Sequence, residues 1–299
     1  MSGRTQIRLL PDGRRLYLHD GPIDIILEAH GAPDDVQSAY RAAASRFVGV
    51  LDELCSELLI LRKLPGPDVP TPVGNIAQRM LAAVLPFASD TFITPMAAVA
   101  GAVAEEILAA MANAASLDRA YVNDGGDIAL HLAPGQHFVL GMVAGPDRPS
   151  LFGSAELHAA EPVRGVATSG WRGRSFSLGI ADAVTVLADR AANADAAATI
   201  ISNAVDLPGH PNVVRIPARD LAPDNELADR PVTRTVGDLT PHDIDVALCH
   251  GENVARTLLE RNLICAAALH LRGKTRTIGD PLRMATLEKS MHDRSLVHA

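Results

Sequence analysis

Apolar and polar positions near the start of the chain follow two different periods. The stretch "RRLYLHDGPIDIILEA" (14–29) predicts two strands joined by a turn at Gly21–Pro22, because two apolar runs flank a glycine–proline pair. From Asp34 to Leu61 the apolar positions recur every three or four residues, which predicts an amphipathic helix with one break at most. These positions are Val36, Tyr40, Ala43, Phe47, Leu51 and Leu58.

A proline-rich segment separates this helix from two more. Residues 63–74 hold four prolines and two glycines and are expected to form a loop. Helical periodicity returns over 76–87, and a further helix is predicted over 95–113, with Thr94 as its N-cap and Pro95 at its first position. That helix carries small residues that would let either another backbone or a ligand come close: Ala97, Ala100, Gly101 and Ala104.

Beyond residue 119 the pattern changes to short strands separated by turns. Strands are predicted over 119–123, 128–133, 137–145, 163–170 and 181–188, with turns at Gly125–Gly126 and Pro134–Gly135, and a helix over 193–205. Because strands and helices mix without strict alternation, the predicted fold class is α+β, with a strand-rich centre packed by helices.

We predict a single domain over residues 1–299. It has a helical N-terminal half to about residue 115, the strand-rich centre and a C-terminal helical segment. A basic tail over 271–295, with six basic and three acidic residues, ends the chain, and it is expected to be a solvated tail or a dock for an acidic partner.

Composition narrows the class of protein. The chain is 47% hydrophobic and only 3% aromatic, so its core must consist mainly of alanine and aliphatic residues. A net charge of −8 argues against a dedicated nucleic-acid binder, which usually presents a basic face. The N-terminus lacks the apolar region of a secretory signal, and the apolar run 96–111 is short and interrupted by Glu105 and Glu106. We therefore expect a cytoplasmic protein with no membrane partner.

The cysteines suggest reduced thiols. Cys55, Cys249 and Cys265 are odd in number and lack the spacing of a zinc site, so buried thiols are the favoured interpretation and a catalytic cysteine is the alternative.

The sequence "NDGGD" (123–127) places two carboxylates around a pair of glycines. Glycines allow positive φ and bring backbone N–H groups close to a ligand. Asp127 could accept hydrogen bonds from a ligand, or Asp124 and Asp127 together could hold a metal. A plain hairpin turn explains the same residues, since hairpins favour aspartate and glycine.

The sequence "ATSGWRGRSFS" (167–177) gathers donors suited to a phosphate. The hydroxyls of Thr168 and Ser169, the flexible Gly170 and the guanidinium groups of Arg172 and Arg174 lie within seven residues. The only tryptophan, Trp171, offers a flat face to an aromatic ring. The alternative is an exposed loop with solvated arginines.

A polar stripe runs along the predicted helix "NADAAATIISN" (193–203). Asp195, Thr199 and Asn203 are four residues apart and share one face, so Asp195 and Thr199 could ligate a hard divalent cation. The local alternative makes Asn193 the N-cap and places Asp195 in the first turn, where it complements the helix dipole.

Taken in order, these motifs resemble the ApbE-like superfamily, flavin transferases that move FMN from FAD onto a protein threonine. The matching pieces are "VNDGGD" (122–127), "ATSG" (167–170) and "ADAAAT" (194–199), within a stretch of about residues 90–206. The segments "GPIDIILEA" and "SFSLGIADAVTVLA" look more like an uncharacterised cytosolic sister family, which would cover nearly the whole chain.

The resemblance implies roles for individual residues. Asp195 and Thr199 match the magnesium-binding pair, and Thr168, Ser169 and Gly170 match the loop near the flavin nucleotide. Asn123, Gly125 and Gly126 belong to the binding turn, in which Asp127 matches the turn acid. The implied cofactors are Mg²⁺ and FAD or FMN.

The chain also departs from the family pattern. The helix before the turn reads "AVAGAVAEE" and lacks the family's lysine, while Leu178 and Ala183 stand where a histidine and a proline would be; only Asp182 is kept.

Three hypotheses follow. The first is a magnesium-dependent flavinyl or phosphoryl transferase with Asp182 or Asp127 as base. The second is a protein that binds a nucleotide or another anionic metabolite without transfer, in sulfur assimilation toward homocysteine, where Cys249 and Cys265 are candidates. The third is a structural homo-oligomer, with helix 95–113 as its interface.

Overall fold

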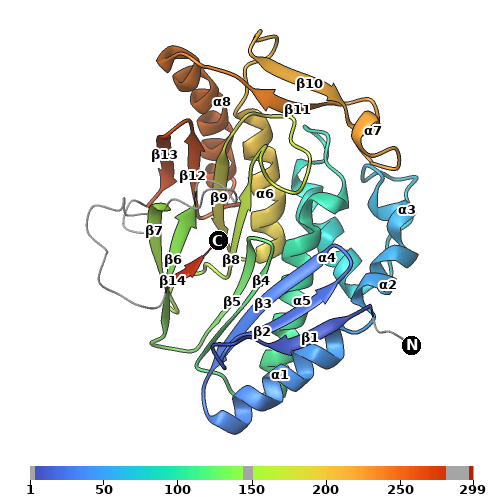
Figure 1. Ribbon diagram of the computed structural model, residues 1–299, viewed down its shortest axis with the longest axis vertical. Coiled ribbons are helices and arrows are strands. Elements are labelled where there is room, and N and C mark those ends of the chain that lie inside the picture. The colour runs from blue at the N-terminus through green and yellow to red at the C-terminus, as the bar shows by residue number, and fades with distance from the viewer. Residues whose placement is uncertain (1–3, 144–150, 281–295, 299) are drawn as a thin grey trace.

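A nine-stranded antiparallel sheet forms the centre of the protein (Figure 1). The computed structural model describes residues 4–143, 151–280 and 296–298. Strands follow one another in the sheet in the order β1-β2-β3-β4-β5-β8-β9-β12-β13. They are β1 (Gln6–Leu9), β2 (Leu16–Asp20), β3 (Ile23–His30), β4 (Arg119–Asp124), β5 (Asp127–Leu132), β8 (Gly165–Ser169), β9 (Ala183–Ala188), β12 (Ala266–Leu271) and β13 (Lys274–Gly279).

Helices cover one face of this sheet. Helix α1 packs on β2 and β3, α5 on β4 and β5, α6 on β8 and β9, and α8 on β12 and β13. The helices are α1 (Pro33–Phe47), α2 (Val50–Ser56), α3 (Leu58–Leu61), α4 (Asn75–Val84), η1 (Leu85–Phe87), η2 (Pro95–Ala98), α5 (Val99–Ala114), α6 (Ala191–Ala204), α7 (Ala218–Leu221) and α8 (Pro241–Glu260).

Two smaller sheets complete the α+β architecture. A three-stranded sheet, β14-β6-β7, consists of β6 (His137–Val143), β7 (Leu151–His158) and β14 (Leu296–His298), and a ribbon pairs β10 (Val213–Pro217) with β11 (Pro231–Val236). One hydrophobic cluster lies between the large sheet and the helices, and a second joins its other face to β6 and β7. Strand β9, "AVTVLA", is therefore buried on both faces, which explains why its apolar residues do not alternate with polar ones.

The predicted small-residue helix is part of the core. Its residues Gly101 to Ala104 are buried, and it packs on α1, α4 and α6. Its buried residues pack within the chain, and the hypothesis that this helix forms an interface between protomers stays a prediction. Thr94 does stand at the N-cap position with Pro95 after it, but the Thr94 side chain makes no capping hydrogen bond.

The same helix has its predicted bounds to within one residue. Together η2 and α5 run 20 residues from Pro95 to Ala114, and by length and composition this is the one helix in the described residues that could cross a membrane. Half of it is buried inside the protein, and its two glutamates are paired: Glu106 with Arg46 and Arg79, Glu105 with Arg190. These are the surroundings of a core helix.

Several local predictions need correction. The helix predicted over 34–61 breaks twice, at Gly49 (φ +94°) and at Glu57, and forms α1, α2 and α3. Cys55 and Cys249 are exposed and Cys265 is half-buried, so they are not the buried thiols expected. The basic tail begins as strand β13, where Lys274 and Arg276 pair with Asp245 on α8. The remainder of the tail, 281–295, lies outside the described residues.

Candidate functional site

The "NDGGD" segment is a two-residue hairpin between β4 and β5. Asp124 and Asp127 are paired across the two strands, and Gly125 and Gly126 both have positive φ, +65° and +116°. Two consecutive positive φ values are typical of a type I′ turn, whose twist suits antiparallel strands. The Asn123 side chain accepts a hydrogen bond from the Gly126 N–H at 2.8 Å and fixes the turn. The turn interpretation is therefore confirmed, and the turn also forms one wall of a cavity.

This cavity has a volume of about 510 Å³ and collects the three motifs singled out in the sequence. It lies where the β4–β5 turn, the end of β8, the start of β9 and helices α5 and α6 meet. Of the predicted site residues it is lined by Asn123, Gly125, Gly126, Asp127, Thr168, Ser169, Gly170, Arg174, Asp182, Asp195 and Thr199. The sequence separates them by up to 76 positions, and the pairing of β5 with β8 and the packing of α6 on β8 bring them together.

Arg172 is the predicted ligand-binding residue that does not line this cavity in the described part of the chain. Its guanidinium lies over the Trp171 ring at 4.5 Å, and its Nε is 3.4 Å from an oxygen of Asp182. These contacts direct it to a neighbouring hollow, whereas Arg174 lines both, and the part of Arg172 in phosphate binding stays a prediction.

Helix α6 begins two residues earlier than the sequence suggested. Its N-cap is Arg190, so Asn193 is the third helical residue and Asp195 the fifth. Asn193 instead donates to Asp189 at 2.9 Å, and the alternative that made it the N-cap is wrong. The polar stripe is not continuous. Asp195 and Thr199 line the cavity, whereas the Asn203 side-chain oxygen accepts a hydrogen bond from the Leu178 N–H at 2.9 Å.

Three carboxylates at this site resist ionisation. Asp195 accepts from the Gly101 N–H at 3.1 Å, yet burial, with the nearby charge of Asp124, raises its pKa to about 7. Burial also raises the pKa of Asp127 well above its usual range, and the charges of Asp195 and Asp124 add to this effect. Burial raises the pKa of Asp124 to about 7, while the Asp24 N–H and Arg174 act in the opposite direction. Asp127 and Asp195 keep accessible surface, because their side chains line the cavity. A cation in the cavity would favour the ionised forms.

Asp182 has contacts of a different kind. One of its oxygens accepts from the Trp171 indole N–H at 3.2 Å and the other from the Arg272 backbone N–H at 2.6 Å. A side chain at Gly170 would collide with the Asp182 carbonyl oxygen, so the glycine permits this close approach. Asp182 therefore ties the 168–174 loop to strand β12, and its proposed part as a base stays a prediction.

The sequence did not single out some residues of this site. Asp24, Ile26, Val143 and Ser175 also line the cavity, together with Ala100, one of the small residues expected to let a ligand come close. Asp24 and Ile26 alternate with the buried Ile23, Ile25 and Leu27 along β3, so period-two alternation places them on the other face of the sheet. The pairing of β3 with β4, which brings Asp24 next to Asp124, could not be inferred from the sequence.

The raised pKa of Asp124 leads to a testable prediction. Because its folded pKa of about 7 lies above its unfolded value of 3.8, the wild type loses stability as pH rises through this interval. Asparagine does not titrate and can still accept from the Asp24 N–H. The unfolding free energy of Asp124→Asn, measured relative to that of the wild type, should therefore rise by roughly 2 kcal/mol as the pH is raised from about 5 to about 8. Urea unfolding of both proteins at each pH, without divalent cations, measures this change. A difference in unfolding free energy that is the same at pH 5 and pH 8 would contradict the prediction.

A magnesium ion would find hard oxygen donors here, but not a complete site. Asp195 and Thr199 offer a carboxylate and a hydroxyl one turn apart on α6. Among the described residues, no three histidine, cysteine, aspartate or glutamate side chains are grouped to hold a metal. This donor set fits Mg²⁺ in a nucleotide site, where one or two carboxylates act with phosphate oxygens and water.

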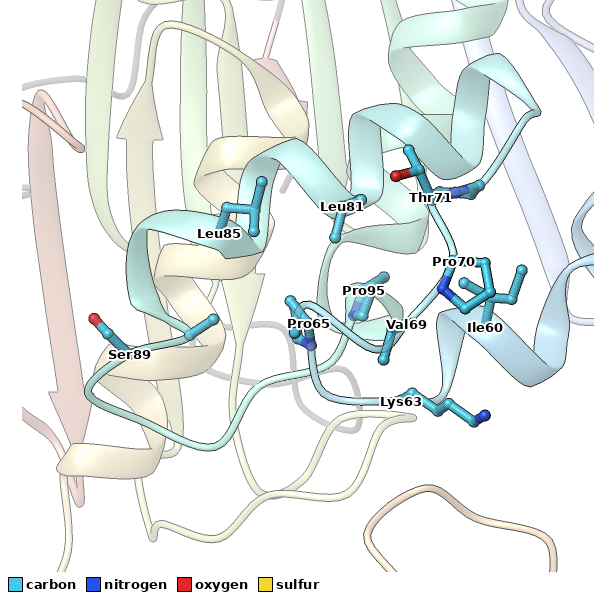
Figure 2. Close-up of a pocket in the computed structure, with 13 residues that line it drawn as sticks. Ile60, Lys63, Pro65, Val69, Pro70, Thr71, Leu81, Leu85, Ser89 and Pro95 are labelled. Atoms are coloured by element: carbon cyan, nitrogen blue, oxygen red, sulfur yellow. The ribbon is translucent and has the colours of Figure 1, made fainter.

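A second hollow, of about 410 Å³, is chemically different (Figure 2). The proline-rich loop, Ile60 and helix α4 line it with mostly apolar side chains. Lys63 is the one charged lining residue in the described part of the chain, and no carboxylate accompanies it. This hollow has the hydroxyls of Thr71 and Ser89, but its described lining lacks the carboxylates that a metal–phosphate site needs. The 510 Å³ cavity has both and contains the predicted motifs, so it is the candidate site.

Comparisons with known proteins agree with the motifs. A family model described as "AbpE bacteria" matches residues 7–277. The UPF0280 protein of Methanopyrus kandleri is 43% identical over 165 residues, which cover 55% of this chain and 61% of that protein. The UPF0280 protein of Methanothrix thermoacetophila is 42% identical over 120 residues, 40% of this chain and 49% of that protein. The chain thus spans about half to three-fifths of the length of these curated relatives.

Among solved structures, the apo form of the Pseudomonas stutzeri flavinyl transferase ApbE is similar to this chain. The alignment covers 93% of this chain and 96% of that chain, with 11% sequence identity and a TM-score of 0.37.

Proposed function

We propose, from the premise that this chain belongs to the ApbE-like family described as "AbpE bacteria", that its cavity binds a flavin nucleotide or a similar phosphate-bearing ligand with Mg²⁺. The observation that carries the proposal is the meeting of three motifs around one cavity: the glycine turn, the Thr168–Gly170 loop and the Asp195–Thr199 pair. Each motif alone has a structural explanation. Their convergence from separate elements supports a binding site.

Different parts of the cavity suit different parts of such a ligand. Asp195 and Thr199 would hold the magnesium ion, which when bound acts as a Lewis acid on phosphate oxygens. Ser169 offers a hydroxyl to a phosphate, and Arg174 a guanidinium. The Thr168 hydroxyl is bonded to the Thr185 hydroxyl at 2.9 Å, and the Thr168 N–H donates to Asp127 at 3.2 Å. Thr168 thus positions Asp127.

Magnesium-dependent flavinyl or phosphoryl transfer is the reaction class that fits. An acceptor oxygen would attack phosphorus, the phosphoanhydride bond would break so that the other phosphate leaves with the bridging oxygen, and the acceptor proton would pass to a base. Asp127 suits the base better than Asp182. Burial raises the pKa of Asp127 well above its usual range, which makes it a stronger base once a bound cation favours its ionised form, whereas both oxygens of Asp182 already accept hydrogen bonds.

A second candidate is binding of an anionic metabolite without transfer. Leu178 stands where the resemblance would place a histidine, and its N–H is bonded to Asn203, so this position supplies no proton-transfer group. Cys249 and Cys265 do not line the cavity, so the sulfur-pathway version of this function receives no support from a thiol at the site.

Calorimetry separates the two candidates. FAD, FMN and ADP are titrated into the protein with and without Mg²⁺, followed by an assay for FMN transfer to a threonine-containing peptide. Magnesium-dependent binding of FAD with transfer would support the transferase, and binding without transfer would support the second candidate. No binding of any of the three nucleotides in either condition would contradict both in their nucleotide form.

A further inference from the structure

A hollow of about 290 Å³ adjoins the candidate site on the other side of the 171–177 loop. Three arginines line it: Arg172 and Arg174 from the loop, and Arg234 from strand β11. No acidic residue in the described part of the chain lines it, although Asp182 pairs with Arg172 from the neighbouring cavity. The chain as a whole carries a net charge of −8, so a hollow lined only by positive charges is unusual on it.

Hydrogen bonds fix the walls of this hollow. The Thr233 N–H donates to the Ser177 carbonyl at 2.8 Å, and the Thr233 hydroxyl donates to the Gly179 carbonyl at 2.7 Å. These bonds fasten the β10–β11 ribbon to the loop and hold Arg234 beside it. Arg172 is held by Trp171 and Asp182. These contacts thus hold Arg172 and Arg234 in position on opposite sides of the hollow.

Two of the three guanidinium groups have unused donors. Among the described residues, no direct hydrogen bond or ion pair is made by Arg174 or Arg234, in contrast to Arg46, Arg190 and Arg276. The charge of Arg174 still lowers the pKa of Asp124 and Asp127 from a distance. Arg174 packs over Gly125 and lines both the hollow and the cavity, so it lies between the two. Guanidinium groups bind phosphate and carboxylate through paired N–H donors.

We propose that this arginine hollow is an anion subsite, which binds a phosphate or carboxylate group beside the candidate site. The group comes either from the far end of the ligand in the cavity or from a separate anionic acceptor. This inference goes beyond the proposed function and does not depend on the magnesium pair, because the hollow contains neither Asp195 nor Thr199.

Titration of inorganic pyrophosphate without Mg²⁺ tests the subsite. Arg234→Gln should weaken binding by about 10-fold or more, as expected for a lost charge-assisted hydrogen bond. Arg234→Lys should retain most of the affinity because it keeps the charge. Arg41→Gln, at an exposed arginine of α1, is the matched control and should not weaken binding. Arg234 is exposed, and thermal unfolding of each variant verifies the fold.

Two results would overturn the proposal: pyrophosphate affinity that is unchanged in Arg234→Gln, or no binding to the wild type at millimolar concentration. Repeating the titration with saturating ADP and Mg²⁺ identifies the source of the anion. Displacement by ADP assigns the subsite to the same ligand, and continued binding assigns it to a separate acceptor. If nucleotide binding itself fails while the Arg234 effect persists, the subsite stands and the proposed function does not.

Discussion

Replacing Asp195 by asparagine should abolish magnesium-dependent nucleotide binding. Asp195 is the carboxylate of the proposed metal pair, and asparagine carries no charge to offset the ion or the ligand phosphates. Loss of even an outer partner of a metal ligand costs about 10–100-fold in affinity, so loss of the carboxylate itself should cost at least about 100-fold. Calorimetry with ADP and Mg²⁺ measures the effect, because ADP needs no flavin contact.

The fold should survive this change. The asparagine carbonyl can still accept from the Gly101 N–H, which contacts Asp195 at 3.1 Å. Because burial raises the pKa of Asp195, the neutral side chain should also make the metal-free protein more stable at pH 8. Asp224→Asn, at an exposed aspartate outside the cavity, is the matched control. Magnesium-dependent ADP binding that persists in Asp195→Asn would place the ion elsewhere.

Features set by neighbouring residues were predictable from the sequence. The strands around Gly21–Pro22, the Gly125–Gly126 hairpin and the helix after Thr94 all follow from local patterns of glycine, proline and apolar residues. The motif order "VNDGGD", "ATSG", "ADAAAT" also identified half of the described residues that line the cavity. Such signals are readable because they depend on a few residues at fixed spacing.

Features set by distant packing were not predictable. Arg172 and Arg174 look equivalent in "WRGR", and only the positions of Trp171 and Asp182 direct Arg172 out of the cavity. Strand β1, "QIRL", is short and exposed at all four residues, so it has no alternation to detect. Helix α6 begins at Ala191 because its first turn is enclosed by other elements, and this overrides the capping preference of Asn193.

Alanine at Gly165 or Gly101 should destabilise the protein strongly and disturb the site. The first turn of α6 lies between these two glycines. A Cβ at Gly165 on β8 would collide with the backbone of Arg190 and Ala191, and a Cβ at Gly101 on α5 would collide with the backbone of Ala191. Backbone cannot rotate away as a flexible side chain can, so we expect a loss of about 3 kcal/mol or more at Gly165, at the upper end of overpacking costs.

A shift of α6 would affect the candidate site, because this helix carries Asp195. Displacing its first turn would move Asp195, and at Gly101 it would also lengthen the hydrogen bond from the Gly101 N–H to Asp195. Gly101→Ala should therefore lose Mg²⁺-dependent ADP binding as well as stability. Gly66→Ala is the matched control, because that glycine is exposed and a Cβ there meets no atom within 4 Å. Urea unfolding compares the three variants. If Gly165→Ala lowers the unfolding free energy no more than Gly66→Ala does, then α6 is free to shift, and close packing does not hold Asp195 in place.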